Sequence, residues 1–584
     1  MMCGRAGEQE TTKSANKGKM KGGFRAASFI FAFMTFGNMA YLANSVSLVL
    51  YFFEVMHFDI SGSTNTLTNF VASSFLLSIV GAWVSDTYLN RYTTVLISGL
   101  LEVLAFMLMT IQAHDPKLHP SPCNKSSCVK GGIAVMLYAS LYLFALGGGG
   151  VKGALPALGA DQFEKDAKAL SSYFNFVLLS ASVGGIGGVT VVAWVSTNKG
   201  WWWGFFICTI VTFVGWSVFA LGKPYYRIHA PGESPILRIA QVFVVSFKNR
   251  RMMLPNTVAD LYENKETRGK ILHTEQFRCL DKAAIVGENG LLSSRKICTV
   301  TQVEEVKVLT RMMPILASTI IVNACLAQFQ TLSIQQGSRM NLYLGSFKVP
   351  AQSIPVVPLL FLSIIIPVYE LIFVPFAHKI TGNPSGITQL QRVGIGLVLS
   401  AVSMATAALV EVKRRDQSIK NPSKPISLFW LSFQYAIFGV ADMFTLAGLQ
   451  EFFYKEAPVG MKSLSTSFTY VSVSLGYCLS GVLIHIINSV TEKLAPSRKG
   501  WLVGRDLDKN RLDLFFWFMA VLNIFNFLNY LYWASWYKYK TDEPKIWLVQ
   551  KTGSTMPSLM KKSTTTVEDN GNEEEKEKAC SPIK

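Results

Sequence analysis

The sequence predicts an all-α polytopic membrane protein with two groups of six membrane-spanning helices. Half of its 584 residues are hydrophobic, 12% are aromatic and only 16% are charged. This combination is rare in soluble proteins of this length and typical of polytopic membrane proteins. Apolar segments that are long enough to cross about 30 Å of hydrocarbon recur along the chain, with one long polar interval in the middle.

The twelve predicted spans are justified by their length, since a helix needs about 20 mainly apolar residues to cross the hydrocarbon core. The first six lie near residues 28–53, 66–85, 93–113, 133–155, 171–195 and 201–222. The second six lie near residues 306–336, 353–377, 390–412, 427–455, 463–490 and 512–537.

The polar segments define the remaining domains. The two six-helix bundles cover residues 28–222 and 306–537. The polar segments are a Lys-rich tail over 1–27, a central loop over 223–305, and a tail over 538–584 whose end is rich in Glu. Because Lys and Arg favour the cytoplasmic side, we expect the central loop and both tails in the cytoplasm. The second tail has the composition of a disordered segment, and a kinase is one candidate partner of the tails.

The net charge of +18 does not indicate a nucleic-acid partner, because the basic residues lie in the loops rather than on one face with aromatic residues. The expected partner is the lipid bilayer, and the expected location is the plasma membrane. One loop departs from the charge rule: Lys413, Arg414 and Arg415 fall on the outside.

One stretch of the central loop, residues 234–250 (SPILRIAQVFVVSFKNR), predicts an amphipathic helix with a basic end. Such a helix lies either on the membrane surface or against the bundles, and the sequence leaves both open.

The nine cysteines form no CxxC pair and no His/Cys cluster with metal-ligand spacing, so we predict no metal site and no cofactor. Cys123 and Cys128 lie in a polar loop that also contains the sequon at Asn124. If this loop is extracytoplasmic, a small disulfide and a glycan fit there. The alternative is a sequon that occurs by chance.

Lys152 is the most informative single residue, because it follows a run of four glycines in the span near 133–155. An ammonium group inside the bilayer costs roughly 2.5–3.5 kcal/mol even on a lenient scale, so it normally faces a wet cavity or a carboxylate and marks a functional site. The alternative is a lysine at the end of the span whose ammonium group extends to the headgroups. The glycines at 147–150 allow a helix or a ligand to approach closely.

Several motifs carry a family resemblance. Residues 81–92 (GAWVSDTYLNRY) resemble the Asp/Arg loop signature of the major facilitator superfamily. Three more are similar to the proton-coupled oligopeptide transporter family: 149–152 (GGVK), 159–163 (GADQF) and 172–175 (SYFN). Four resemble its plant branch, the nitrate/peptide transporter family: 273–284 (HTEQFRCLDKAA), 302–307 (QVEEVK), 390–392 (LQR) and 458–466 (PVGMKSLST). Two are most similar to the subfamily with abscisate importers and nitrate-related members: 41–44 (YLAN) and 197–201 (TNKGW).

The resemblance covers about residues 25–540 and implies the major facilitator fold, with twelve transmembrane helices as two six-helix bundles around a midplane site. It also implies an ion pair across the bundles between Lys152 and Asp442. Breaking this pair would help to exchange which side of the membrane is open, because removing one partner of a buried pair costs about 3–5 kcal/mol. The alternative is a static structural pair.

Two departures from the family pattern bear on the mechanism. The first helix of the family usually carries Glu-x-x-Glu-Arg (or Lys), taken to couple protons to the substrate, but here the positions are occupied by Met34, Gly37 and Asn38. In the seventh helix, Leu326 stands where nitrate-binding members have a His. Leucine neither donates a hydrogen bond to nitrate nor titrates. Peptide transport and that nitrate site are therefore disfavoured, and proton coupling is left open.

The remaining candidate residues have two interpretations each. With the first-helix carboxylates gone, the proton carrier is either Glu102 or Asp442, although Glu102 can also be a structural group that is hydrogen-bonded between helices. Asp86 and Arg91 are interpreted as a conformational lock in the loop after the second span. The candidates for the substrate cavity are Tyr41, Asn44, Leu326, Gln328 and Gln330, although polar residues between helices often serve only in packing.

The sequence thus predicts a secondary active transporter of a small anionic solute, such as a plant hormone like abscisate or nitrate, that works by alternating access. Protons are a candidate second substrate. The alternative is a membrane sensor that binds nitrate or a hormone and transports little. An enzyme is disfavoured, because no nucleophile–base set, metal cluster or phosphate-binding loop stands out.

Overall fold

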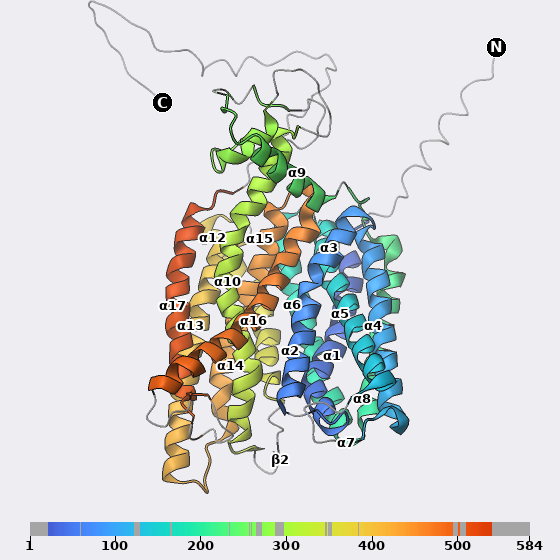
Figure 1. Ribbon diagram of the computed structural model, residues 1–584, viewed down its shortest axis with the longest axis vertical. Coiled ribbons are helices and arrows are strands. Elements are labelled where there is room, and N and C mark those ends of the chain that lie inside the picture. The colour runs from blue at the N-terminus through green and yellow to red at the C-terminus, as the bar shows by residue number, and fades with distance from the viewer. Residues whose placement is uncertain are drawn as a thin grey trace, which may run out of the picture. The chain divides into compact units, whose positions relative to one another are not determined.

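The structure is a computed structural model that describes residues 21–58, 60–121, 129–163, 166–232, 234–255, 257, 260–263, 271–285, 297–344, 347–348, 353–383, 385–494, 500–502, 508 and 510–539. All of these residues belong to one compact unit, Met1–Asp542. Among them, twelve helices are long and apolar enough to cross a membrane. The predicted all-α polytopic fold is confirmed, and the helices form two bundles of six (Figure 1).

The first bundle contains the spans between Phe24 and Leu221. Four of its spans are continuous helices: α1 (Phe24–Glu54), α4 (Arg91–His114), α5 (Gly131–Ala160) and α8 (Trp201–Leu221). The second span breaks at Leu77 into α2 (Ile60–Leu76) and α3 (Ser78–Thr87). The fifth consists of α6 (Ala167–Gly187), the π-helical turn η3 (Gly188–Val192) and α7 (Ala193–Asn198).

The second bundle also has four continuous and two interrupted spans, but its interruptions lie in its second and fourth spans. Its continuous helices are α10 (Val300–Ser338), α13 (Gln389–Lys420), α16 (Lys462–Leu494) and α17 (Leu512–Trp536). The eighth span consists of α11 (Val356–Val368), η8 (Tyr369–Phe373) and α12 (Val374–Thr381). The tenth consists of α14 (Leu431–Asp442), η10 (Met443–Ala447) and α15 (Gly448–Glu456). A two-stranded hairpin, β1 (Tyr343–Leu344) with β2 (Phe347–Lys348), follows α10.

The interruptions in the second bundle are π-helical turns, which frequently occur at functional sites because they re-aim the side chains next to them. The turn η10 begins directly after Asp442, and η8 contains Glu370. Both carboxylates therefore lie where the regular helical hydrogen-bond ladder is disturbed.

The central segment forms a small helical layer at one end of the bundles (Figure 1). Its helix α9 (Pro235–Lys248) matches the predicted amphipathic helix and packs through Val242 on the 3₁₀ helix η6 (Arg278–Ala284). Arg238 Nη1 on α9 lies 2.6 Å from Glu305 Oε2 on α10. Of the two predicted positions for this helix, the structure has the one against the bundles.

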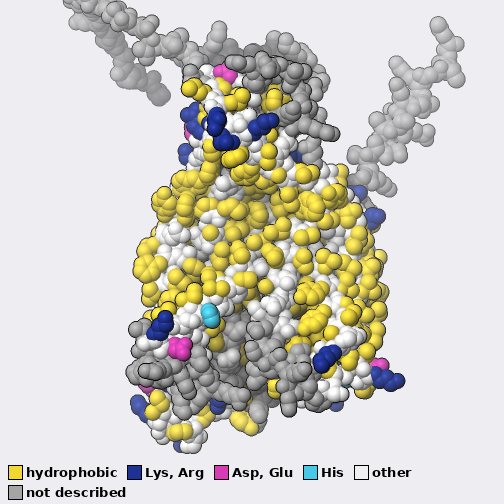
Figure 2. All heavy atoms as spheres, viewed as in Figure 1, with side chains coloured by type: hydrophobic (Ala, Val, Ile, Leu, Met, Phe, Trp, Pro, Cys, Tyr) yellow, Lys and Arg dark blue, Asp and Glu magenta, His cyan; other side chains and the backbone are white. Residues whose placement is uncertain are grey.

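The surface has the pattern expected for a bilayer environment. Figure 2 shows hydrophobic side chains over the middle of the visible face, with Lys and Arg at both ends, including a cluster at the end that carries α9. Many large apolar side chains on the helices are exposed, among them Leu371, Val135 and Phe525. Such a belt is the counterpart of the hydrocarbon core.

Candidate functional site

The ammonium group of Lys152 is held by residues of the first bundle. On α2, Ser74 Oγ accepts a hydrogen bond from Lys152 Nζ at 3.3 Å. The same nitrogen lies 4.5 Å from the ring centroid of Tyr41 on α1 and 5.2 Å from that of Phe75 on α2. Cation–π attraction of this kind strengthens when the cation is desolvated. Lys152 is partly buried and is not at the end of its helix, so the interpretation as a lysine that extends to the headgroups does not hold.

Glu102 on α4 is the carboxylate that acts electrostatically on Lys152. It is only 9% exposed. The glycines of α5 make the space between the two groups: a Cβ on Gly148 would lie 3.1 Å from Lys152 Nζ and 3.3 Å from Glu102 Oε1. A Cβ on Gly147 would lie 2.9 Å from Glu102 Cγ. The glycine run therefore brings α4 and α5 close together and leaves a small gap that both charges face.

The predicted ion pair between Lys152 and Asp442 is not formed in this conformation. Among the described residues no ion pair joins them, since the ammonium group is occupied by Ser74, Tyr41 and Phe75. Asp442 is partly buried on α14 and close enough to Tyr477 for an electrostatic interaction. An exchange of partners for Lys152 would need a movement of the two bundles.

The aromatic rings next to Lys152 continue into the second bundle. The ring of Phe75 stacks on Tyr470 of α16 at 6.0 Å with an interplanar angle of 12°, and lies 6.4 Å from Tyr477. The Tyr477 hydroxyl donates a hydrogen bond to Gln330 Oε1. The predicted cavity residues Tyr41 and Gln330 thus belong to one patch that spans both bundles.

The other predicted cavity residues lie in packed surroundings. Gln328 is buried, and its Nε2 donates to Ser480 Oγ at 2.7 Å within the second bundle. Leu326 packs against apolar clusters of both bundles. Asn44 is 1% exposed, and neither amide atom has a hydrogen-bond partner in the described structure. For Gln328 the packing interpretation fits best.

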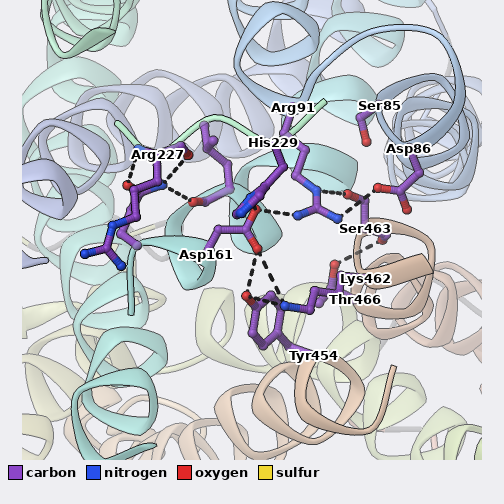
Figure 3. A network of polar contacts seen from close by, with 12 residues as sticks. Ser85, Asp86, Arg91, Asp161, Arg227, His229, Tyr454, Lys462, Ser463 and Thr466 are labelled. Carbon is purple, nitrogen blue, oxygen red and sulfur yellow. Dashed lines mark hydrogen bonds and ion pairs between the residues drawn. The ribbon is translucent and has the colours of Figure 1, made fainter. Parts of the chain in front are cut away.

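Two buried polar networks connect the bundles at the end that carries α9. In the first, the Arg91 network, Arg91 at the start of α4 contacts Asp161 at the end of α5 and donates to Asp86 Oδ1 at 3.1 Å (Figure 3). From the second bundle, Ser463 Oγ accepts from Arg91 Nε at 2.7 Å, and the Tyr454 hydroxyl donates to Asp161 Oδ1 at 2.7 Å.

In the second network, the Arg392 network, the arginine and its carboxylate partner belong to the second bundle and the contacting helix to the first. Arg392 lies near the start of α13, and its Nη1 donates to Glu451 Oε2 on α15 at 3.0 Å. Its Nη2 donates to Asn175 Oδ1 on α6 at 2.6 Å, while Asn175 Nδ2 donates to Glu370. Ser171 Oγ on α6 also donates to Glu451 Oε2, at 2.9 Å. Both Arg392 and Glu451 are fully buried.

These networks are related by the repeat of the fold. In each, an arginine near the start of the third helix of a bundle pairs with a carboxylate near the end of the fourth helix and contacts the start of a helix in the other bundle. Together they close this end of the interface between the bundles.

The comparisons with known proteins agree with this architecture. The family model described as "POT family" matches residues 92–502. In Arabidopsis thaliana, protein NRT1/PTR FAMILY 4.5 is 42% identical over 90% of this chain and 95% of its own length, and NRT1/PTR FAMILY 4.6 is 40% identical over 91% and 96%. This chain belongs to the POT family.

Solved structures of POT transporters share the fold at low sequence identity. The in meso crystal structure of the POT family transporter PepTSo has a TM-score of 0.61 at 17% identity and covers 88% of this chain and 98% of that one. A POT family transporter in complex with 5-aminolevulinic acid has a TM-score of 0.57 at 12% identity, with the same coverage. This chain is thus a multi-pass membrane transporter and not an enzyme, as the sequence predicts.

The departures of this POT-family chain in the first helix have a clear local structure. Asn38 Nδ2 donates to Met34 O at 2.9 Å within α1, so its amide serves its own helix. A Cβ on Gly37 would meet no atom within 4 Å, so this position borders open space. Between Phe24 and Phe53, α1 has no acidic residue. The charge of Lys152 must therefore be balanced from other helices.

Several residues of the family motifs, for which the sequence predicts no individual role, belong to these networks. Asp161, Asn175, Arg392 and Ser463 lie in the POT motifs, yet only Asp86 and Arg91 were predicted to act as a lock. Glu370 and Glu451 were missed altogether. Their signal in the sequence is a carboxylate within an apolar span, the same signal that singles out Lys152. Cys123, Asn124 and Cys128 lie outside the described residues.

A third cluster lies in the central segment, where His273, Asp281 and Glu304 have the spacing of metal ligands. Lys307 Nζ, however, lies 2.7 Å from Asp281 Oδ1 and 2.8 Å from Glu304 Oε1. Its ammonium group already satisfies both carboxylates, so a cation would have to displace it. We interpret the cluster as an ionic clasp between η6 and α10.

Proposed function

We propose that this POT-family transporter carries a small organic anion, of the chemical class of abscisate, across the plasma membrane by alternating access. The observation that carries the proposal is the place of Lys152: a cation held among aromatic rings, between the two bundles. A carboxylate pairs with the ammonium group, and an apolar body stacks on the rings of Tyr41, Phe75 and Tyr470.

Nitrate is the less favoured solute. Nitrate has no apolar part that could pack against the aromatic rings. At the position where the family resemblance would place a histidine, Leu326 provides no hydrogen-bond donor. A peptide needs a carboxylate for its amino terminus, which α1 does not supply. The sensor alternative finds no support in the matched proteins, whose descriptions are of transporters.

The transport cycle follows from the two networks. With the Arg91 and Arg392 networks formed, the end that carries α9, which we assign to the cytoplasm, is closed. Binding of an anion at Lys152 changes the charge balance of the site, and once the anion has left, Lys152 exchanges its partners in the first bundle for Asp442 in the second. A ligand shifts such an equilibrium only by its differential affinity for the two conformations. The anion supplies this difference because it competes with the groups that hold Lys152.

The test is uptake of labelled abscisate and labelled nitrate into proteoliposomes that contain the purified protein. We expect saturable uptake of abscisate and little of nitrate, and at least a tenfold loss of abscisate uptake in Lys152→Gln. Lys413→Gln is the matched control, since Lys413 also lies over an aromatic ring, Trp430 at 3.5 Å, but at the far end of α13. Uptake of nitrate alone, or equal uptake by Lys152→Gln and wild type, would contradict the proposal.

A further inference from the structure

Three ionisable residues lie in the middle of spans, away from the two networks: Glu102, Lys152 and Asp442. Intramembrane charges are costly and therefore usually have a partner and a function. In this conformation Asp442 forms no ion pair within the described residues, while Glu102 and Lys152 face the same gap beside Gly148. Among the described residues Glu102 and Lys152 form no direct ion pair either, but they are opposite charges of the first bundle that lie near each other and interact electrostatically.

The surroundings of Glu102 make its charge depend on Lys152. The carboxylate is buried where α4 meets α5, and among the described residues Lys152 is the charged group that acts on it electrostatically. The charged or titratable groups near the pair are Lys152 on α5, the phenol of Tyr41 on α1 and, from the second bundle, Asp442 on α14 with the phenols of Tyr470 and Tyr477 on α16. Since the phenols are neutral at physiological pH, Lys152 alone stabilises the ionised carboxylate of Glu102.

We propose that Glu102 is the counter-ion of Lys152 and the group that takes up the co-transported proton in this chain. The inference rests on the proposed transport of an anion that binds at Lys152. When the anion pairs with the ammonium group, the carboxylate of Glu102 loses its partner in a site of low dielectric. It then takes up a proton from water on the same side, and the proton leaves again when the anion departs.

The charge balance sets the stoichiometry. Without solute, Lys152 and Glu102 sum to zero, and with one monovalent anion bound at Lys152 and one proton on Glu102 they again sum to zero. The intermediate with the anion but no proton carries one uncompensated negative charge in the membrane, which is unfavourable. One proton therefore accompanies each monovalent anion, and transport is electroneutral.

The glycine at 148 provides a probe of the pair that removes no charged group. A methyl group there would lie 3.1 Å from Lys152 Nζ and 3.3 Å from Glu102 Oε1, closer than ordinary contacts, so it pushes the two groups apart. Gly132 on the same helix is the matched control, because a Cβ there would meet no atom within 4 Å.

The first measurement needs no solute. Infrared difference spectroscopy of the purified protein follows the protonated-carboxyl band as the pH is changed. We expect a carboxyl band that is absent in Glu102→Gln and that titrates at higher pH in Lys152→Gln and in Gly148→Ala, with Gly132→Ala like wild type. An identical titration in wild type, Lys152→Gln and Gly148→Ala would overturn the pairing.

The second measurement uses proteoliposomes with labelled abscisate, and compares accumulation driven by an acid-outside pH gradient with exchange at equal pH. We expect Glu102→Gln to lose the accumulation and to retain exchange within about threefold, since glutamine resembles the protonated acid. Accumulation that persists in Glu102→Gln, or exchange that is lost together with it, would overturn the proton-carrier role. If wild type takes up no abscisate while the carboxyl band still responds to Lys152, the proposed function fails and the pair stands.

Discussion

Arg392 and Asn175 are 217 residues apart in sequence, yet Arg392 Nη2 donates to Asn175 Oδ1 at 2.6 Å from one bundle to the other. The same guanidinium group pairs with Glu451 and lies 5.3 Å from the ring centroid of Tyr369. Because Arg392 is fully buried, its charge is compensated only while these contacts exist. Moving the bundles apart at this end breaks the bond to Asn175 but leaves the pair with Glu451 intact, so the contact can open at moderate cost.

We expect Arg392→Gln to shift the protein away from the conformation described here. The pair with Glu451 lies within one bundle, so its loss affects both conformations equally, whereas the hydrogen bond to Asn175 exists only in the conformation described here. A hydrogen bond to a charged group contributes about 1.5–3 kcal/mol, so we expect a shift of roughly ten- to a hundredfold in population. Spin labels at Lys168 on α6 and Lys379 on α12, both exposed, should show a longer distance in the variant. Arg250→Gln, on the exposed end of the central segment, is the control, and an unchanged distance in Arg392→Gln would contradict the assignment.

Tyr454→Phe tests the Arg91 network with a smaller change. It removes the hydroxyl that donates to Asp161 Oδ1 at 2.7 Å but keeps the ring in its apolar cluster. A hydrogen bond to a charged group contributes about 1.5–3 kcal/mol, so we expect a shift of the same spin-label distance in the same direction as for Arg392→Gln. Tyr532→Phe, on the exposed face of α17, should have no effect. An unchanged distance in Tyr454→Phe would contradict the assignment of this hydrogen bond to the closed end.

The spans could be predicted from the sequence because the bilayer imposes one physical requirement, about 20 apolar residues, on each of them. The interruptions could not. Leu77, where the second span breaks, and the π-helical turns at Gly188, Tyr369 and Met443 lie in apolar runs that look like any other helix. Such turns depend on packing between helices, which hydropathy does not describe.

The sequence predicts which charged residues belong to the site, but not which groups they contact. Lys152 and Asp442 stand out because each is a single charge in an apolar span, but which groups each of them contacts depends on the conformation of two bundles. Lys152 was expected to pair with Asp442 and instead lies over Tyr41, beside Ser74. Cation–π contacts leave no spacing pattern in a sequence, so an aromatic partner could not be inferred from it.

The ionic clasp of the central segment predicts a strong dependence on Lys307. This lysine is fully buried between Asp281 and Glu304, so Lys307→Met leaves two buried carboxylates close together. We expect a loss of about 3–5 kcal/mol in the docking of the segment, seen as faster chymotrypsin cleavage within residues 250–300, where neither variant changes an aromatic cleavage site. Lys282→Met is the control, since its ammonium group donates to the exposed Arg250 O at 2.6 Å.

The same clasp predicts that metal ions do not stabilise the wild-type protein. The ammonium group of Lys307 occupies the position between the carboxylates, and like charges repel. Added zinc should therefore leave the unfolding temperature of wild type unchanged, whereas Lys307→Met, with its carboxylates and His273 free to bind a cation, should gain stability. Zinc stabilisation of wild type that is lost in His273→Gln would show that the cluster is a metal site.

The basic loop that departed from the charge rule has a local explanation. The Arg414 guanidinium lies 2.8 Å from a Glu411 carboxylate oxygen and 2.6 Å from one of Asp508, and the Arg415 guanidinium lies 3.5 Å from one of Asp513. Neighbouring carboxylates therefore compensate both positive charges. Burial alone would raise the pKa of Asp508, but hydrogen bonds from Arg414 and Ser418 lower it below its ordinary value. Its contribution to stability is therefore present at neutral pH and is lost only as the pH falls through this lowered pKa.

Asp508→Asn tests that sign. As the pH falls below the ordinary pKa of an aspartate, about 4, the wild-type unfolding temperature should fall by more than that of Asp508→Asn, and the two should differ by a constant amount at higher pH. Because the Asp508 side chain is 38% exposed, solvent screens the pair and the difference will be small. A difference between the variants that grows from pH 5 to pH 8 would contradict the assignment.

Asp442 is expected to matter for the transport cycle and not for the conformation described here, since it forms no ion pair with any residue that the structure describes. Asp442→Asn keeps the shape of the side chain and removes the charge that would receive Lys152 when the bundles move. We therefore expect an unchanged spin-label distance between positions 168 and 379, together with at least a tenfold lower uptake of abscisate. Asp416→Asn, at the exposed end of α13, is the matched control and should transport like wild type. Uptake at the wild-type rate by Asp442→Asn would show that Lys152 never needs a partner in the second bundle. In that case Glu102 and the bound anion would balance the charge of Lys152 in turn during the cycle.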